Sequence, residues 1–243
     1  MSAYDLSLIL PCYNEGPTFE DNVKRIILEL KKTKYKWQLI FVEDKSGDNT
    51  RDVIQKIVRK GDNCKAIFHK VNEGRGKAVM DGIKAAEAPI CGFIDVDCEI
   101  SPSCISLFAR EVQRGTDLVV GHRFYEKRLK SISRVVATRV YAILVRTLLG
   151  LPIEDTEAGC KFFNRKKILT VLPKVNDYKW FWDTEICARS CWEGLKVSDV
   201  PVLFIRRLDK KSTVNLVSDS LDYFIKLIKF SLKFRKTRFN ASR

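Results

Sequence analysis

Two aspartates stand one residue apart directly after an apolar segment of the chain. Asp95-Val96-Asp97 follows residues 89–94, which have the composition and length of a buried strand. Ligands of open α/β sheets bind at the carboxyl ends of strands, and carboxylate oxygens are ligands that Mg²⁺ and Mn²⁺ prefer. The pair therefore predicts a divalent cation site that carries a phosphorylated ligand. The alternative is a solvated turn, because Asp-x-Asp is common by chance.

Two further acidic segments also follow predicted strands. Residues 11–15 come after the first strand, and residues 43–50 come after the second. Right-handed crossovers place such loops on one edge of a parallel sheet. One carboxylate could then accept a hydrogen bond from a base or ribose while another holds the metal that bridges a diphosphate. Asp48 and Asn49 fit a helix cap instead.

The elements that must position these loops alternate between short apolar segments and helical patterns. Strands are predicted at residues 6–10, 37–42, 64–69, 89–94 and 118–120, and helices at 17–32, 48–60, 76–86 and from 101 onward. The pattern predicts an α/β fold whose mostly parallel sheet is flanked by helices. Further along, we predict helices at 131–149, 182–192 and 218–236, with an extended edge segment at 197–204.

Composition limits the class of protein. The 243 residues are 45% hydrophobic and 30% charged, which suits a globular domain, while the net charge of +14 indicates an anionic partner. Eight cysteines without a CxxC pair, together with two histidines, argue against zinc and favour reduced core residues of a cytosolic protein. We see neither a signal peptide nor an apolar run long enough to span a membrane.

In chain order, the motifs resemble those of family 2 glycosyltransferases with the GT-A fold, and more narrowly the dolichyl- and polyprenyl-phosphate sugar transferases. The matching segments are LILPCYNE (8–15), FVEDKSGDNT (41–50), NEGRGKA (72–78), FIDVD (93–97), VVGHR (119–123), SISR (131–134), DTEAGCKFF (155–163) and DVPVLFIRRLDKKST (199–213). Each motif alone is weak, whereas the ordered set is specific.

The resemblance implies roles for particular residues. It implies nucleotide-sugar contacts at Pro11, Tyr13, Glu15, Val42, Asp44, Asp95, Val96 and Arg207. It places Mg²⁺ or Mn²⁺ on Asp95 and Asp97, with Glu99 standing where the mannosyltransferases carry a glutamine. It also implies that Arg123 neutralises phosphate groups and that Arg134 contacts the lipid phosphate, since guanidinium groups suit phosphate oxygens.

Lys77 and Arg134 each have an ordinary alternative. Lys77 lies in a glycine-flanked turn that opens a predicted helix, which is a natural place for an anion, and we assign it to the nucleotide-sugar site. A lysine at a helix start can equally face solvent. Arg134 can likewise be an ordinary helix arginine.

Asp155 begins the segment that marks the lipid-phosphate branch. In transfer to a hydroxyl, a carboxylate here would be the general base. An acceptor phosphate is already ionised at neutral pH and needs positioning and charge neutralisation instead. We therefore expect Asp155 to orient a metal or a basic residue, and we group it with Asp97, Arg123 and Arg134 as catalytic.

Two departures from the family pattern affect the donor site. Glu43-Asp44-Lys45-Ser46 replaces the usual Asp-Asp-Gly-Ser, and Ser212-Thr213 lacks the usual phosphate-binding lysine. Lys210 or Lys211 could substitute for that lysine. The identity of the sugar nucleotide is therefore left open between GDP-mannose and a UDP-sugar.

Much of the positive charge lies at the end of the chain. Residues 206–243 hold eleven Lys or Arg and three Asp, a net +8 of the total +14. We divide the chain into a catalytic domain, 1–212, and a basic amphipathic extension, 213–243, which suits docking on an anionic membrane. The alternative is a helix packed on its own domain. No nucleic-acid module is recognised.

The sequence thus predicts an inverting, metal-dependent transfer from a nucleotide-sugar to dolichyl or polyprenyl phosphate. We expect a peripheral protein on the cytoplasmic face of a membrane, docked directly or through an anchoring partner protein. One alternative is transfer to a glycan or protein hydroxyl, with Asp155 as base. Another is a nucleotide- or membrane-binding module without catalysis.

Overall fold

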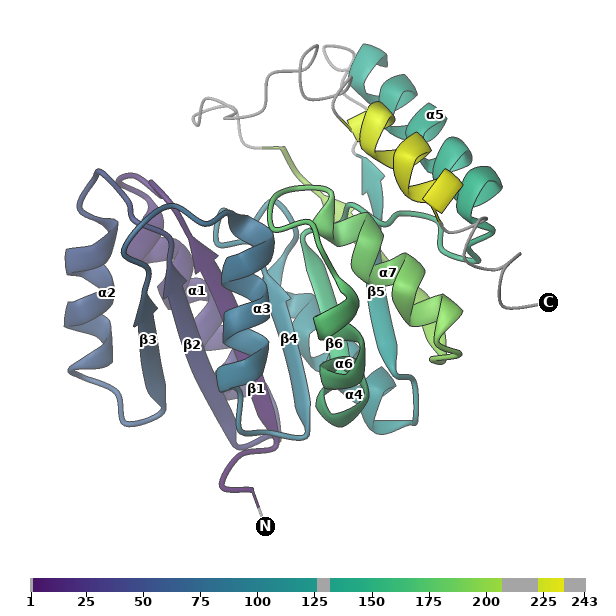
Figure 1. Cartoon of the computed structure of the whole chain (residues 1–243). Coiled ribbons are helices and arrows are strands. Elements are labelled where there is room, and N and C mark those ends of the chain that lie inside the picture. Colours follow the sequence, from purple (N-terminus) through teal and green to yellow (C-terminus); the bar gives the residue numbers. More distant parts are fainter. Residues whose placement is uncertain (1, 126–131, 207–222, 234–243) are drawn as a thin grey trace.

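A seven-stranded sheet forms the centre of the molecule (Figure 1). The computed structural model describes residues 2–125, 132–206 and 223–233. In spatial order the strands are β3 (Cys64–Phe68), β2 (Trp37–Glu43), β1 (Leu6–Cys12), β4 (Ile90–Ile94), β6 (Cys160–Asn164), β5 (Leu118–Tyr125) and β7 (Val197–Phe204). Every residue of β1 and β4 is buried, as expected for central strands covered on both faces.

One strand runs against the others. β6 pairs antiparallel with both β4 and β5, whereas the remaining neighbours pair in parallel. Ile94, the last residue of β4, lies opposite Cys160, the first residue of β6. The segment that leads into β6 therefore reaches the same edge of the sheet as the segments that leave β1, β2 and β4.

Helices cover both faces of the sheet. α1 (Phe19–Lys32), α2 (Thr50–Val58) and α4 (Ile105–Gln113) contribute to one apolar cluster, together with alternate side chains of β1 and β2. α3 (Arg75–Ala85), α6 (Arg165–Val171) and α7 (Trp182–Trp192) contribute to the cluster on the other face. Short 3₁₀ turns at Pro102–Cys104 and Leu172–Lys174 precede α4 and follow α6.

A third apolar cluster joins α5 (Ile132–Leu149), α7 and a helix at residues 223–233. Figure 1 shows the helix at 223–233 lying along α5, beyond the sheet edge where β1 ends. Its inward face presents Tyr223, Leu227 and Phe230. Within the described residues, no helix is both long enough and apolar enough to cross a bilayer.

Within the described residues, the predicted strands and helices are confirmed in kind and order, and so is the mostly parallel sheet; both ends of the helix predicted at 218–236 lie outside the described residues. β1 and β5 extend beyond the predicted ends, so Pro11 and Arg123 belong to strands. The prediction missed β6 and α6. Residues 160–164 are a short, mostly apolar segment inside a motif that we interpreted as part of a functional site, so no strand was assigned there. β7 is an edge strand, which agrees with the position of Pro201 within it. None of the eight cysteines, all of which lie in the described residues, forms a disulfide.

Candidate active site

The loops after β1 and β2 are bonded to each other. The amide of Asn14 donates to Ser46 Oγ at 3.0 Å, and Asn14 Oδ1 accepts from the amide of Gly47 at 2.7 Å. Asp48 Oδ1 accepts from the amide of Thr50, the first residue of α2, at 3.0 Å. The N-cap residue of α2 is Asn49, which makes no side-chain cap hydrogen bond, so the predicted cap falls on Asn49 by position while Asp48, one residue earlier, supplies the side-chain bond to the first turn. The two loops form one surface.

The predicted nucleotide contacts around β1 differ in exposure. Tyr13 is 43% exposed, so its ring is accessible for stacking on a base, and its amide donates to Glu15 Oε1 at 3.1 Å. Pro11 lies inside β1 opposite Val42 of β2. The side chain of Val42 is fully buried in the core, so a ligand at this edge could meet only its backbone.

Asp44 is buried and saturated with hydrogen bonds. Its Oδ1 accepts from the amide of Glu73 at 2.8 Å and lies 2.7 Å from His69 Nδ1, while its Oδ2 accepts from the amide of Gly74 at 2.8 Å. Only 3% of Asp44 is exposed. The carboxylate therefore fixes the segment that begins α3 against the end of β2, a role that the motif alone did not indicate.

Lys77 points along α3. Its ammonium forms ion pairs with Asp81 and, at 3.5 Å, with Glu73, so its charge is already compensated. Arg75, two residues earlier in the same motif, reaches the aspartate motif instead. This part of the chain therefore brings a guanidinium into the site.

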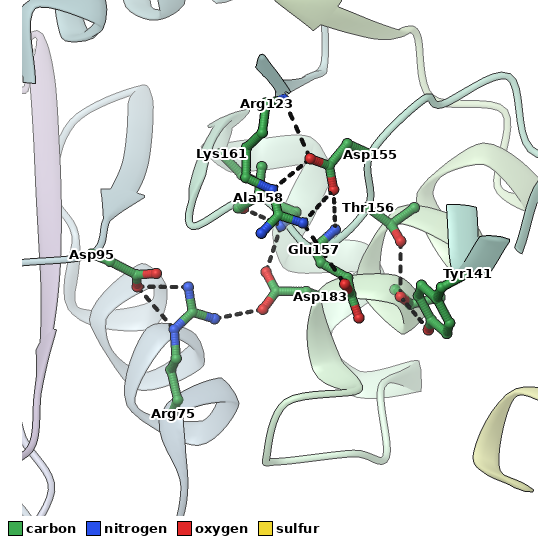
Figure 2. A network of polar contacts seen from close by, with 11 residues as sticks. Arg75, Asp95, Arg123, Tyr141, Asp155, Thr156, Glu157, Ala158, Lys161 and Asp183 are labelled. Carbon is green, nitrogen blue, oxygen red and sulfur yellow. Dashed lines mark hydrogen bonds and ion pairs between the residues drawn. The ribbon is translucent and has the colours of Figure 1, made fainter. Parts of the chain in front are cut away.

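Arg75 joins two carboxylates from distant parts of the chain (Figure 2). Its Nε and one terminal nitrogen donate to Asp95 Oδ1 at 2.9 and 2.7 Å, and the other terminal nitrogen donates to Asp183 Oδ2. Lys161 donates to Asp183 Oδ1 and to the carbonyl of Ala158. Although burial opposes its charge, Asp183 and Asp95 raise the pKa of the Arg75 guanidinium, which stays protonated.

Gly159 leaves the space that Asp95 occupies. The Asp95 amide donates to the Gly159 carbonyl at 2.9 Å, and a Cβ on Gly159 would overlap the Asp95 carboxylate. Burial, opposed by Arg75, raises the pKa of the Asp95 carboxyl to about 6. The Asp95 side chain is nevertheless 35% exposed, so it borders an accessible surface.

Asp155 is bound by Arg123 at the ends of β5 and of the segment before β6. Arg123 Nε donates to Asp155 Oδ2 at 2.6 Å, and a terminal nitrogen donates to Oδ1 at 2.9 Å. Burial alone would raise the pKa of Asp155, but Arg123 holds it below its usual value. Glu157 lies 3.7 Å from Arg123, and burial raises its pKa to about 7.

The donor set at this edge suits a hard divalent ion. Among the described residues, no group of three or more metal-ligating side chains converges. Asp97 Oδ1 accepts from the amide of Glu99 at 3.1 Å, which keeps the predicted metal segment tightly turned. Mg²⁺ commonly binds through one or two carboxylates, with waters and substrate phosphates completing its coordination. Asp95 and Asp97 fit that arrangement.

The balance of charge points the same way. Figure 2 shows most of the cluster, whose carboxylates and cations are Asp95, Asp97, Asp155, Glu157, Asp183, Arg75, Arg123 and Lys161. At a pH high enough for Asp95 and Glu157, whose pKa values are raised, to be ionised, five negative charges face three positive ones. A divalent cation would balance the remainder.

Several site residues were not predicted as such. Three site residues were missed because their contacts depend on the placement of β6 and α7: Arg75, Lys161 and Asp183. The one available signal was an acidic residue in the first turn of a predicted helix, at residues 182–185. The Arg134 side chain and Arg207 lie outside the described residues.

The fold and the site define a glycosyltransferase with the GT-A fold. A solved structure of glucosyl-3-phosphoglycerate synthase from Mycobacterium tuberculosis, in complex with Mn²⁺, UDP and glucosyl-3-phosphoglycerate, superposes with a TM-score of 0.70 at 17% identity. The match covers 93% of this chain and 80% of that one. The same synthase with Mn²⁺, UDP-glucose and phosphoglyceric acid gives 0.69 at 18% identity, covering 94% and 80%.

The chain belongs to glycosyl transferase family 2, whose family model matches residues 7–171. Among curated relatives, glycosyltransferase AglD of Haloferax volcanii is 29% identical over an alignment of 222 residues that covers 89% of this chain and 35% of that protein. The dolichyl-phosphate beta-glucosyltransferase of Saccharomyces cerevisiae is 26% identical over 226 residues, covering 81% and 66%. The chain thus spans between about a third and two thirds of the length of the curated relatives it matches most strongly.

Proposed function

We propose that this protein transfers a sugar, with inversion, from a nucleotide-sugar to dolichyl or another polyprenyl phosphate, with Mg²⁺ or Mn²⁺ as cofactor. The observation that carries the proposal is the Arg123–Asp155 pair. A carboxylate held by two short hydrogen bonds to a guanidinium, with its pKa lowered, is a poor general base. An acceptor phosphate needs no base at neutral pH, so it suits such a site.

The chain's own residues then have the following roles. Asp95 and Asp97 would hold the metal, which supplies positive charge to the leaving diphosphate when bound. An oxygen of the acceptor phosphate forms the bond to the anomeric carbon as the bond to the diphosphate oxygen breaks, and the nucleoside diphosphate departs with that electron pair. Asp155 positions Arg123, whose charge lies where phosphate groups must meet.

UDP-glucose is the first donor to test. Relatives from Saccharomyces cerevisiae and Dictyostelium discoideum are dolichyl-phosphate beta-glucosyltransferases, and the structural neighbour binds UDP-glucose with Mn²⁺. Radiolabelled UDP-glucose, dolichyl phosphate in vesicles and Mn²⁺ should yield label that partitions into organic solvent. Mild acid should release the label, because a glycosyl phosphate is far more acid-labile than a glycoside. Label that stays in the aqueous phase would contradict the proposal.

Transfer to a hydroxyl is favoured by the placement of Glu157, a half-buried carboxyl that lies 3.7 Å from Arg123 and whose pKa is raised by burial. A carboxyl with a pKa of about 7 is suited to general base catalysis near neutral pH. If the acceptor is a hydroxyl, Glu157 is thus a better base than Asp155. An acid-stable product whose formation is lost in Glu157→Gln would favour this second function. Asp155→Asn with turnover within about threefold of wild type would exclude an essential role for Asp155 in either reaction.

Membrane docking is supported by the outward face of the helix at 223–233. Phe224, Ile225 and Leu232 are 44%, 42% and 61% exposed, and Lys229 and Lys233 share that exposed face. The helix packs on its own domain, as the alternative predicted, and still presents apolar and basic side chains outward. Such a face suits an anionic membrane interface, and eight cysteines that form no disulfide favour its cytoplasmic side.

Vesicle flotation tests the docking face. The triple variant Phe224→Gln, Ile225→Gln and Leu232→Gln should lose most binding to vesicles that contain phosphatidylserine. Leu28→Gln is the matched control, because Leu28 is 57% exposed on α1, away from this face. Equal flotation of both variants would refute the assignment.

A further inference from the structure

Arg75 neutralises two carboxylates of the site when no donor is bound. Its guanidinium lies between the carboxylates of Asp95 and Asp183 (Figure 2). The rings of Phe93 and Trp180 stack near it, with centroids 5.0 and 5.4 Å from its central carbon. Only 12% of the Arg75 side chain is exposed. The guanidinium is thus enclosed by two acids and two aromatic rings.

The two carboxylates around Arg75 differ in what they would lose without it. Asp183 is 4% exposed at its side chain and keeps a second cation, Lys161, on its other oxygen. Asp95 is 35% exposed, and within the described structure Arg75 is the cation that contacts it. The link between Arg75 and Asp95 is therefore the one that can be exchanged at modest cost.

We propose that Arg75 is a resident counter-ion of Asp95 that a divalent metal must displace, and that the donor diphosphate gives the guanidinium its replacement partner. This rests on the proposed function only in assuming a diphosphate donor and a metal near Asp95.

The physical reason is repulsion between like charges. A divalent ion bound to Asp95 would face a guanidinium only a few ångströms away in a partly desolvated site, where Coulomb energies are large. An incoming diphosphate relieves this repulsion, because guanidinium groups bind phosphate oxygens well. Metal and nucleotide should therefore strengthen each other's binding by the same factor, and such couplings are typically about 5- to 150-fold.

The test measures Mn²⁺ binding to the full chain by electron paramagnetic resonance, first without nucleotide. Arg75→Gln should bind Mn²⁺ alone about tenfold more tightly than wild type or better. Arg123→Gln is the matched control, since it removes one positive charge from the same cluster without touching Asp95. Its effect should be several-fold smaller. Arg75→Lys keeps a positive charge beside Asp95, so its affinity for Mn²⁺ alone should lie between those of wild type and Arg75→Gln.

The second measurement repeats the titration with saturating UDP or GDP, whichever raises the melting temperature in the presence of Mn²⁺. The nucleotide should strengthen Mn²⁺ binding in wild type and do so much less in Arg75→Gln. If Arg75→Gln does not fold, the double variant Arg75→Gln, Asp183→Asn removes the unpaired buried acid and serves instead. Unchanged or weaker binding of Mn²⁺ alone by the variant would overturn the proposal. Because no sugar acceptor is present, an error about the acceptor would not affect this result.

Discussion

Gly159 offers a sharp test of the site, because one methyl group there collides with Asp95. A Cβ added to Gly159 would overlap Asp95 Oδ2 and lie 2.6 Å from its Cγ and 3.3 Å from its Cβ. Ordinary carbon contacts need at least about 3.5 Å, so the carboxylate must move by roughly 1 Å. Movement of that size breaks the pair of hydrogen bonds at 2.9 and 2.7 Å from Arg75.

We expect Gly159→Ala to lower kcat/KM by about 100-fold, the usual effect of a 1 Å misplacement. Overpacking should also cost about 1–3 kcal/mol of stability. Steady-state kinetics and thermal unfolding measure both effects. Gly61→Ala is the control, since the nearest neighbours of its added methyl are side-chain atoms of Cys64 and Asn63 at 3.2 and 3.5 Å, which can shift slightly, at the turn before β3 on the opposite edge of the sheet. Wild-type kcat/KM in Gly159→Ala would refute the reasoning.

Three further perturbations follow from the same cluster. The pKa of Glu157 rises from 4.5 to about 7 on folding, so between these values the folded carboxyl keeps a proton that the unfolded one has lost. The free energy of unfolding should therefore fall by about 1–3 kcal/mol as pH rises through that window, and Glu157→Gln should flatten the decline in denaturant titrations. Arg123→Ala leaves Asp155 buried and unpaired, and we expect a loss of about 3 kcal/mol, or on the order of 10 °C in melting temperature, which the double variant with Asp155→Ala should partly restore. Asp97→Ala should abolish Mn²⁺-dependent transfer while the melting temperature stays within about 2 °C, because Asp97 is only partly buried; metal-independent transfer by this variant would exclude Asp97 as a metal ligand.

Much of the fold was predictable because its signals are local. Apolar runs followed by helical patterns identified most strands, and the motif order indicated which loops lie at the site. β6 was harder to find, because five residues of an antiparallel strand inside a functional motif look the same as a buried loop. Its direction depends on pairing with β4 and β5, which local sequence does not encode.

The site residues were predictable only where the neighbouring sequence fixes their position in the fold. Asp95 and Asp97 stand at a strand end, whereas Arg75 and Asp183 meet across 108 residues of chain. The helix at 223–233 shows a related limit. Its apolar residues were expected to form one stripe, but Tyr223, Leu227 and Phe230 supply a second, inward one. A single helix can bury one apolar face and expose another, and which face is buried depends on how the helix packs on the rest of the chain.

Because β6 runs antiparallel to β4, two separate parts of the chain bring their side chains to the same edge of the sheet. In the function proposed above, the segments that leave β1, β2 and β4 would bind the donor, whereas Asp155 and Glu157, from the segment that leads into β6, would face the acceptor. Insertions between β5 and β6 that leave Gly159 in its contact with Asp95 could then reshape the acceptor side while the loops after β1, β2 and β4 keep their positions. Proteins with this arrangement could then change their acceptor while keeping the residues that bind the donor.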